Sequence, residues 1–471
     1  MEQEKRPFGL RDKLGYMFGD FGNDFTFIFA GSYLMVFYTK VLGLSGTVVG
    51  TLFLAARIVD AFTDVTMGRI VDNLKPARDG RFRPWIRRMC IPVAVASTLM
   101  YLYFINAWPY PAKMAYVVIT YLLWSSFCYT AINIPYGSMA SVISQEAGDR
   151  AALSTYRSVG ASLASLVIGL VVPLVIFETD SLGNQVVNPM RFTITAVVFG
   201  VGAVICYVLC YYLCTERVVL AKKKESAKKE SVGSMLVGLL KNRPLLALVA
   251  AALVLLLASM LGQTMNNYLF LDYFQNARAV AAVNFITVAA MLIMAPFASK
   301  ISANFGKKEA GIIAMLLAAV FYLLLFFLRV KSIPLFMILL FFGTVGTGFF
   351  NMIIWAFITD IIDHQEVTTG KREDGTVYAV YSFARKLGQA FAGGLGGFAL
   401  TAIGYISDAS VQTVEVSNRV YTVATLIPGI CYVLVFLIML FGYPLSKGVV
   451  EENARILQKK REEAVREELG D

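Results

Sequence analysis

Long apolar stretches, separated by short polar segments, run through most of this 471-residue chain. A helix needs about 20 mostly apolar residues to cross the hydrocarbon core of a bilayer, so the chain has room for about a dozen such helices. Charged residues make up only 16% of it, whereas soluble domains carry about 25%. We expect membrane-spanning helices at 15–40, 46–73, 86–107, 113–142, 152–177, 191–214, 242–274, 279–302, 309–329, 333–361, 376–404 and 421–445.

The loops between these predicted helices alternate in charge. Lys and Arg are frequent in 1–14, 73–88 and 216–244, and they are scarce in the loops that would lie on the other side of a membrane. Because cytoplasmic loops are enriched in Lys and Arg, both termini are expected in the cytoplasm, with the chain crossing the inner or plasma membrane of the cell several times. The same bias accounts for the net charge of +10 without a nucleic-acid partner.

The strongest interruption is the polar, Lys-rich segment 216–241, which follows the sixth predicted helix. It separates an N-terminal six-helix half, 1–215, from a C-terminal six-helix half, 242–447. A tail of alternating charge, 448–471, favours a solvated or interfacial helix. Twelve helices with a central cytoplasmic loop are typical of the major facilitator plan, in which sites lie between the halves. The predicted fold class is therefore an all-α membrane protein with 12 transmembrane helices.

Ionisable residues inside the predicted helices are the first candidates for function, because inserting one costs about 2.5–3.5 kcal/mol. Asp60 and Asp64 lie four residues apart and share one helix face. Two neighbouring carboxylates resist joint ionisation, so a bound Na+ or a proton would relieve their repulsion, and the hydroxyl of Thr63 would add an oxygen ligand. The alternative is a salt bridge from Arg57 to Asp60, which can coexist with an ion site.

A second group of polar residues indicates sugar binding. Asn23 and Asp24 lie beside phenylalanines in the first predicted helix. A carboxylate can accept bonds from paired sugar hydroxyls while an aromatic ring stacks on the sugar face. Arg157, deep in the fifth predicted helix, would face an acid or a ligand oxygen. For Asp24 the alternative is an ion pair between helices, and Asp20 is expected to be a solvated or capping acid.

The fourth predicted helix adds further candidates. Thr130 and Asn133 share one side of it by their spacing of three. Pro135, Tyr136 and Gly137 follow, and this segment either only bends the helix or moves as a hinge. We include Asn133 and Tyr136 among the candidate sugar contacts.

The C-terminal half supplies fewer candidates. Lys386 can face a central cavity, and its neighbour Arg385 then points elsewhere, because successive helical residues diverge by about 100°. Asp360, Asp363 and Glu366 recur every three residues at the cytoplasmic end of the tenth predicted helix. We expect these three acids to form gate or interface ion pairs.

Catalysis and cofactor chemistry are not indicated. All six cysteines fall in or beside apolar stretches without a Cys-x-x-Cys pair, so we expect them to be packing residues. His364 is the only histidine, and no nucleophile–base pair or phosphate loop is evident. We expect no enzymatic activity and no cofactor, with Na+ or H+ as a coupling ion.

Several motifs resemble the glycoside–pentoside–hexuronide cation symporters of the major facilitator superfamily, whose best-known member is the melibiose permease. The motifs are GDFGNDF, ARIVDAFTDVTMGRIVD, GRFRPW, YTAINIPYGS and KREDGTVYAVYSFARKLGQAF. The resemblance implies a cation site formed by Asp60, Asp64, Thr63 and Thr130. It also implies sugar contacts from Asp24, Asn23 and Arg157, with Lys386 approaching both sites.

Two positions depart from the melibiose permease, which has an acid in place of Asn133 and a tryptophan in place of Gly137. Both changes make a galactoside less favoured, and the NIPYGS run is more similar to the glucuronide and xyloside branches. We expect a monomer in the lipid membrane to import a glycoside, pentoside or hexuronide with a monovalent cation by alternating access. The alternatives are a Na+-dependent lysophospholipid carrier of related fold, with an apolar cavity, and a sugar sensor that does not transport.

Overall fold

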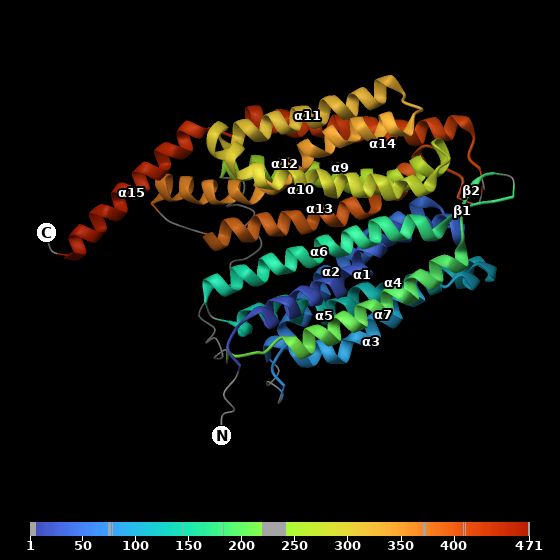
Figure 1. The fold of residues 1–471 in the computed structure, drawn as a ribbon, viewed down its shortest axis with the longest axis horizontal. Helices are drawn as coiled ribbons and strands as arrows, with labels where there is room; N and C mark the ends of the chain where they lie inside the picture. Colours follow the sequence, from blue (N-terminus) through green and yellow to red (C-terminus); the bar gives the residue numbers. More distant parts are fainter. Residues whose placement is uncertain are drawn as a thin grey trace. The chain divides into compact units, whose positions relative to one another are not determined.

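Long helices form nearly all of the described chain (Figure 1). The computed structural model describes residues 6–73, 77, 79–144, 146–181, 183–218, 242–370, 374–407, 409 and 411–469. Within these ranges, eight helices are long and apolar enough to cross a membrane. The expected all-α class is therefore confirmed.

The N-terminal part contains helices and one short hairpin. The helical elements are α1 (Leu10–Val36), the π-helical turn η1 (Phe37–Val41), α2 (Gly46–Asn73), α3 (Arg83–Leu99), the 3-10 turn η2 (Tyr103–Ala107), α4 (Tyr110–Leu122), the π-helical turn η3 (Leu123–Tyr129), α5 (Thr130–Ile143), α6 (Ala147–Ile176) and α7 (Pro189–Leu213). Strands β1 (Phe177–Thr179) and β2 (Gln185–Val187) pair antiparallel, with Glu178 opposite Val186. This hairpin connects α6 to α7.

Helices and helical turns are the elements of the C-terminal part within its described residues. Its elements are α9 (Arg243–Tyr268), η4 (Leu269–Tyr273), η5 (Ala277–Ala279), α10 (Val280–Phe305), α11 (Lys307–Leu328), α12 (Ile333–Thr369), α13 (Asp374–Ala402), α14 (Val414–Leu437), η6 (Ile438–Gly442) and α15 (Lys447–Leu469). The helix predicted at 333–361 is longer than expected and ends only at Gly370, which has a positive φ of 70°. The charged tail forms α15.

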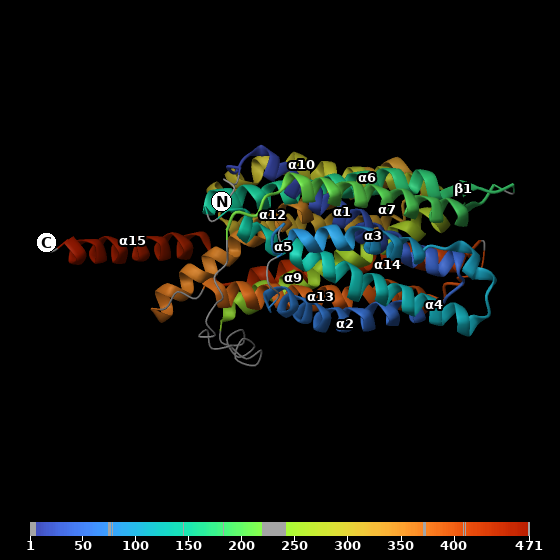
Figure 2. The ribbon, with the colours of Figure 1, turned by 90° about the horizontal axis from the view of Figure 1, so that it is seen from below.

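The helix α1 packs against α6 and α7 (Figures 1 and 2). Glycines allow this close packing: a Cβ atom on Gly22 would lie 3.1 Å from the carbonyl oxygen of Ala203, and one on Gly160 would lie 2.5 Å from that of Met17. The polar side chains of α1 are therefore held close to those of both neighbouring helices.

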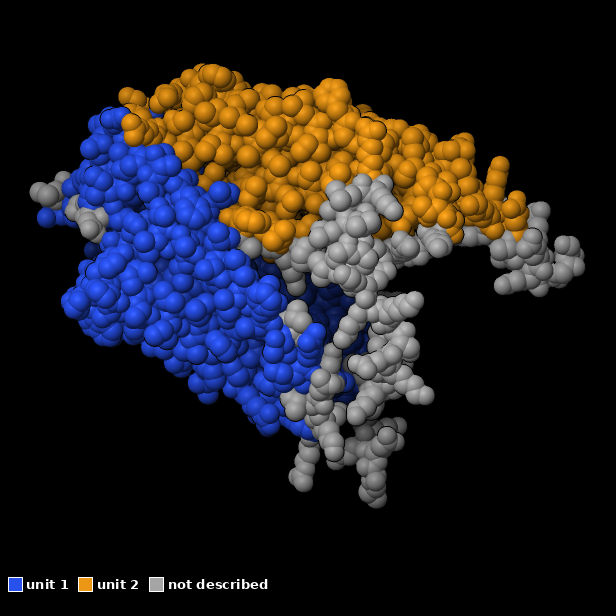
Figure 3. Space-filling view, turned by 180° about the vertical axis from the view of Figure 1, so that it is seen from behind, with its two compact units in different colours: residues 1–224, 266–285, 393–417 blue, residues 225–265, 286–392, 418–471 orange. Residues whose placement is uncertain are grey.

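The chain divides into two compact units (Figure 3). Unit 1 comprises 1–224, 266–285 and 393–417, and the rest of the chain forms unit 2. The predicted N-terminal half lies entirely in unit 1, whereas the predicted C-terminal half is divided between the units. Of the predicted middle loop, 219–241 lies outside the described residues.

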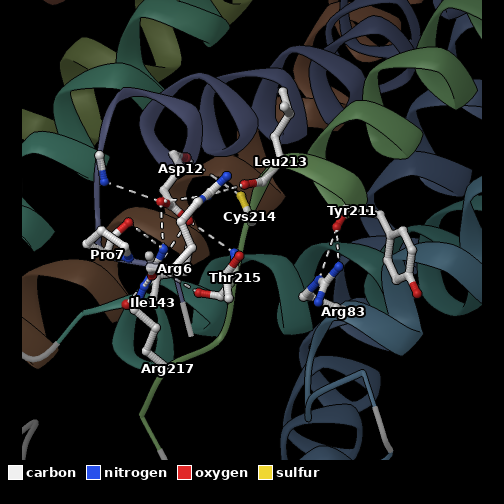
Figure 4. A network of polar contacts seen from close by, with 11 residues as sticks. Arg6, Pro7, Asp12, Arg83, Ile143, Tyr211, Leu213, Cys214, Thr215 and Arg217 are labelled. Carbon is white, nitrogen blue, oxygen red and sulfur yellow. Dashed lines mark hydrogen bonds and ion pairs between the residues drawn. The ribbon is translucent and has the colours of Figure 1, made fainter. Parts of the chain in front are cut away.

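A network of polar contacts fixes the basic end of unit 1 (Figure 4). The carboxylate of Asp12 is fully buried, and it accepts hydrogen bonds at 2.9 Å from the guanidinium groups of Arg6 and Arg217. The carboxylate of Glu216 accepts three backbone N–H groups at the start of α3, from Arg81 to Arg83. The segment that follows α7 thereby ties the beginnings of α1 and α3 together.

The other end of unit 1 contains a close contact between α2 and α13. A Cβ atom on Gly50 would lie 2.6 Å from the carbonyl oxygen of Gly394, and one on Gly394 would lie 2.8 Å from that of Gly50. Both obstructing atoms belong to the backbone, so the two helices can approach this closely only where both residues are glycine.

We therefore expect Gly50→Ala to destabilise the protein by about 1–3 kcal/mol, the usual cost of overpacking. Thermal unfolding of the purified protein in detergent measures the effect. Gly31→Ala is the matched control on α1, because a Cβ atom there would meet no heavy atom within 4 Å. Equal melting temperatures for the two variants would contradict the close contact.

Candidate functional site

The predicted acid pair on α2 faces hydroxyl groups of the η3–α5 segment. Ser125 Oγ lies 2.7 Å from both carboxylate oxygens of Asp60, and Ser126 Oγ lies 2.6 Å from Asp60 Oδ1. The hydroxyl of Thr130 donates to Asp64 Oδ1 at 2.9 Å. Each of the two acids is thus hydrogen-bonded to the same neighbouring helical segment, and the oxygen atoms form a cluster of the kind that binds hard cations.

The π-helical turn η3 explains how two adjacent serines reach one carboxylate. In an α-helix neighbouring side chains diverge by about 100°, and a π turn is wider and often occurs at functional sites. Ser125 and Ser126 are functional candidates that sequence reasoning missed, since α-helical spacing does not place them together. Their one signal in the sequence was a pair of hydroxyl residues inside an apolar helix.

Arg57 and Thr63 complete the surroundings of Asp60. Arg57 Nη1 lies 3.5 Å from Asp60 Oδ2, and its guanidinium carbon lies 5.4 Å from the centre of the Phe27 ring. The salt bridge considered as an alternative is therefore present together with the hydroxyl cluster. The hydroxyl of Thr63 donates to the main-chain oxygen of Asp60 at 3.1 Å. The lone pairs of this hydroxyl oxygen can therefore face an ion.

An ion pair joins α1 to α6. Arg157 Nε donates to Asp20 Oδ1 at 2.8 Å, and Asp20 is only 5% exposed. The expectation that Asp20 is a solvated or capping acid is wrong. The close approach of the two helices at Gly160 brings Arg157 within reach of the face of α1 that carries Asp20.

The ring of Tyr136 packs against Arg157 of this ion pair. Its ring stacks on Tyr16 with centroids 4.7 Å apart, and the guanidinium carbon of Arg157 lies 5.6 Å from the Tyr136 ring centre. The side chain is fully buried, and its hydroxyl donates to the carbonyl oxygen of Tyr16 at 2.6 Å. The structure therefore places Tyr136 as a support for Arg157, with its hydroxyl already occupied.

Two asparagines connect α1 with α5. Asn23 Nδ2 lies 3.4 Å from Asn133 Oδ1, and the hydroxyl of Tyr207 donates to Asn23 Oδ1 at 2.8 Å. Asn23 is buried and held from two sides, whereas Asn133 is half-buried. A hydrogen bond from the Asn133 amide to a solute is thus sterically reasonable.

Asp24 differs from the other acids of unit 1. It is half-buried, and within the described residues its carboxylate has no hydrogen bond or ion pair. Its electrostatic neighbours are Asp20 and Arg157. A partly buried carboxylate normally has hydrogen-bond partners. Because Asp24 has none among the described residues, both of its oxygens can accept hydrogen bonds from the hydroxyl groups of a ligand.

Gly137 borders an open space. It is exposed, and a Cβ atom there would meet no heavy atom within 4 Å. A larger side chain at this position would have room, so this side of α5 is open.

The remaining predicted residues belong to unit 2. Lys307 Nζ lies 2.6 Å from Asp360 Oδ1, and Asp360 is buried. Asp363 and Glu366 are half-buried on the last turns of α12. Lys386 lies on α13, and its side chain is outside the part of the chain that the structure describes.

Histidine and cysteine take no part in either polar group. His364 Nδ1 lies 3.2 Å from Asn453 Nδ2 of α15, and the six cysteines are free thiols, five of them buried. Among the described residues, no group of three or more His, Cys, Asp and Glu side chains could hold a metal ion. A cation at Asp60 and Asp64 would therefore need hydroxyl oxygens as additional ligands.

We expect the Asp20–Arg157 pair to be strongly coupled. In a double-mutant cycle of Asp20→Asn and Arg157→Gln, measured by thermal unfolding, the interaction should be worth about 1.5–3 kcal/mol, as for other hydrogen bonds to charged groups. The same cycle with Asp24→Asn in place of Asp20→Asn is the control and should give a smaller interaction. Additive effects of Asp20→Asn and Arg157→Gln would contradict the pairing.

Comparisons with known proteins identify the family of this chain. The family model described as MFS/sugar transport protein matches residues 15–447. The chain is 31% identical to the uncharacterized symporter YjmB of Bacillus subtilis, covering 97% of this chain and 96% of that protein. It is also 31% identical to a glucuronide carrier protein homolog of Escherichia coli, covering 94% of both. The crystal structure of a D-xylose-proton symporter has the same fold, with a TM-score of 0.61 at 13% identity over 93% of this chain and 98% of that one. The chain therefore belongs to the MFS/sugar transport protein family.

Proposed function

We propose that this protein imports a glycoside, pentoside or hexuronide together with a cation by alternating access. The observation that carries the proposal is that one compact unit holds two different polar groups. One is an acid pair with hydroxyl partners, suited to a cation, and the other is a carboxylate–amide–guanidinium group, suited to a sugar. The names of the symporter and glucuronide carrier relatives support the same assignment.

The sugar would lie against α1, α5 and α6. Asp24 would accept hydrogen bonds from two sugar hydroxyls, because its carboxylate has no described partner of its own. Asn133 would donate its amide, and Asn23 would hold Asn133 in place. The family resemblance adds Lys386 as a further candidate contact. The lysophospholipid carrier is less favoured, because a lipid tail gains nothing from these polar groups.

Arg157 favours an acidic sugar within this class. Its side chain is 43% exposed and uses Nε for Asp20. Within the described residues, its terminal nitrogens make no hydrogen bond, and a guanidinium edge matches a carboxylate with two parallel bonds. A hexuronide would satisfy both Asp24, through its hydroxyls, and Arg157, through its carboxylate.

The cation, Na+ or H+, would bind at Asp60 and Asp64 with oxygens from Thr63 and Thr130. The two groups are close enough to influence each other. Phe27, on the helix of Asp24, stacks on Tyr129 with centroids 5.3 Å apart, and it also faces the guanidinium of Arg57. A cation that shifts Arg57 or Thr130 would therefore also move Phe27 or Tyr129, the aromatic side chains beside the sugar group.

Alternating access requires contacts that open and close. Lys40 Nζ lies 3.8 Å from Asp272 Oδ1 and 3.2 Å from the carbonyl oxygen of Ala409, and the hydroxyl of Tyr405 donates to Asp272 at 2.7 Å. This cluster belongs to unit 1 and lies at the end of α1 opposite the basic loops. We propose that it closes the outer side of a monomer in the cell membrane, with both termini in the cytoplasm.

The coupling role of Asp64 is tested in proteoliposomes. Uptake of methyl β-D-glucuronide, methyl β-D-xyloside and methyl α-D-galactoside should be driven by an imposed Na+ or H+ gradient for at least one sugar, most strongly for the glucuronide. Asp64→Asn should abolish the gradient-driven accumulation, because the ion then loses a charged ligand. Gradient-driven uptake that survives this substitution would exclude the proposed coupling role.

The outer contact is tested by charge reversal. Each of Lys40→Asp and Asp272→Lys should slow transport and destabilise the protein, because breaking a buried pair costs about 3–5 kcal/mol. The double variant Lys40→Asp/Asp272→Lys should recover part of both losses, since opposite charges face each other again. Uptake rates and melting temperatures of the three variants provide the measurement, and a double variant no better than the worse single variant would argue against the pair.

A further inference from the structure

We infer that Ser125 and Ser126 are ligands of the coupling ion and that they make this ion Na+. The inference rests on the proposed function, because it concerns the cation that drives sugar import. The carboxylate of Asp60 lies 2.6–2.7 Å from both serine hydroxyls, although the two serines are adjacent in the chain. Both serines are at most 4% exposed.

Each serine hydroxyl can serve the carboxylate and an ion at the same time. A hydroxyl has one proton and two lone pairs, so it can donate to Asp60 while a lone pair faces a cation. The hydroxyls thereby hold the carboxylate in one orientation and add neutral oxygen ligands beside it. The contacts satisfy the Asp60 carboxylate in the absence of an ion and leave serine lone pairs for one.

The Thr130 hydroxyl has two possible acceptors. Its oxygen lies 2.9 Å from Asp64 Oδ1 and 3.3 Å from the main-chain oxygen of Ser125. Its single proton can therefore turn from the acid to the carbonyl, which directs a threonine lone pair toward an ion beside Asp64. The second acceptor is the carbonyl of Ser125, a residue of the π turn.

This set of atoms distinguishes Na+ from a proton. A proton needs one basic oxygen, and a single acid would suffice for it. A hard cation needs several oxygen ligands from carboxylates, hydroxyls and carbonyls, which is what Asp60, Asp64, Ser125, Ser126 and Thr130 supply together. The arrangement of many oxygens at the π turn is thus explained by an alkali cation and is superfluous for proton coupling.

Binding of Na+ alone to the purified protein tests the inference without any sugar. Melting temperature and titration calorimetry are followed in NaCl against choline chloride at constant ionic strength. Na+ should stabilise the wild type, since an ion that binds only the folded state raises its stability. Ser125→Ala and Ser126→Ala should each weaken Na+ binding, and the double variant should weaken it about tenfold or more.

Ser141→Ala is the matched control. The hydroxyl of Ser141 donates to the main-chain oxygen of Ser138 on α5, outside the acid pair, so Na+ binding should be unchanged. Ser126→Thr, which keeps the hydroxyl, should retain more Na+ affinity than Ser126→Ala. If the double variant does not fold, the two single variants decide the test, because each retains one serine on Asp60.

The outcomes separate this inference from the proposed function. Wild-type Na+ affinity in the serine variants would overturn the inference, and so would a wild type that ignores Na+ but accumulates sugar in a pH gradient. In both cases cation-coupled import would stand. Sugar uptake that responds to neither gradient would overturn the proposed function itself.

Discussion

Burying a carboxylate inside a membrane helix is costly unless other groups surround it, and this constraint determines how unit 1 is built. Asp60 meets it with two serine hydroxyls and Arg57, and Asp20 meets it with Arg157. Arg57 lies on the same helix as Asp60, but the serines and Arg157 come from other helical segments. Satisfying the acids therefore also fixes the packing of α2 against η3 and of α1 against α6.

Asp24 is the exception among these acids, and the proposed sugar site is built on it. Within the described residues, Asp20 and Asp60 have hydrogen-bond and ion-pair partners, whereas the Asp24 carboxylate has none. Phe27 lies one turn beyond Asp24 and contacts both Tyr129 and Arg57, so aromatic rings connect the candidate sugar group with the candidate cation group. Coupling between the two solutes then needs only a small rearrangement of side chains that already touch.

The sequence predicted the helical class, because apolar length is easy to recognise, and it singled out Asp60 and Asp64, which the structure places against hydroxyl groups. The sugar contacts and the division into two halves stay predictions. Sequence reasoning missed Ser125 and Ser126, since a π turn changes the direction of side chains without leaving a pattern in residue spacing. It also expected Asp20 to be solvated, because its partner lies 137 positions away on another helix. Contacts such as that of Lys40 with Asp272, which bring 266–285 and 393–417 into unit 1, likewise leave no pattern in the sequence.

Cation-driven import requires that the cation group and the sugar group are thermodynamically linked within one protein. Titration calorimetry of the purified protein measures this linkage, with a glucuronide in the presence and absence of Na+ and with Na+ in the presence and absence of the glucuronide. We expect each ligand to tighten binding of the other by the same factor, on the order of 5-fold or more. A sugar affinity that does not change with Na+, measured under conditions in which Na+ binds, would contradict it.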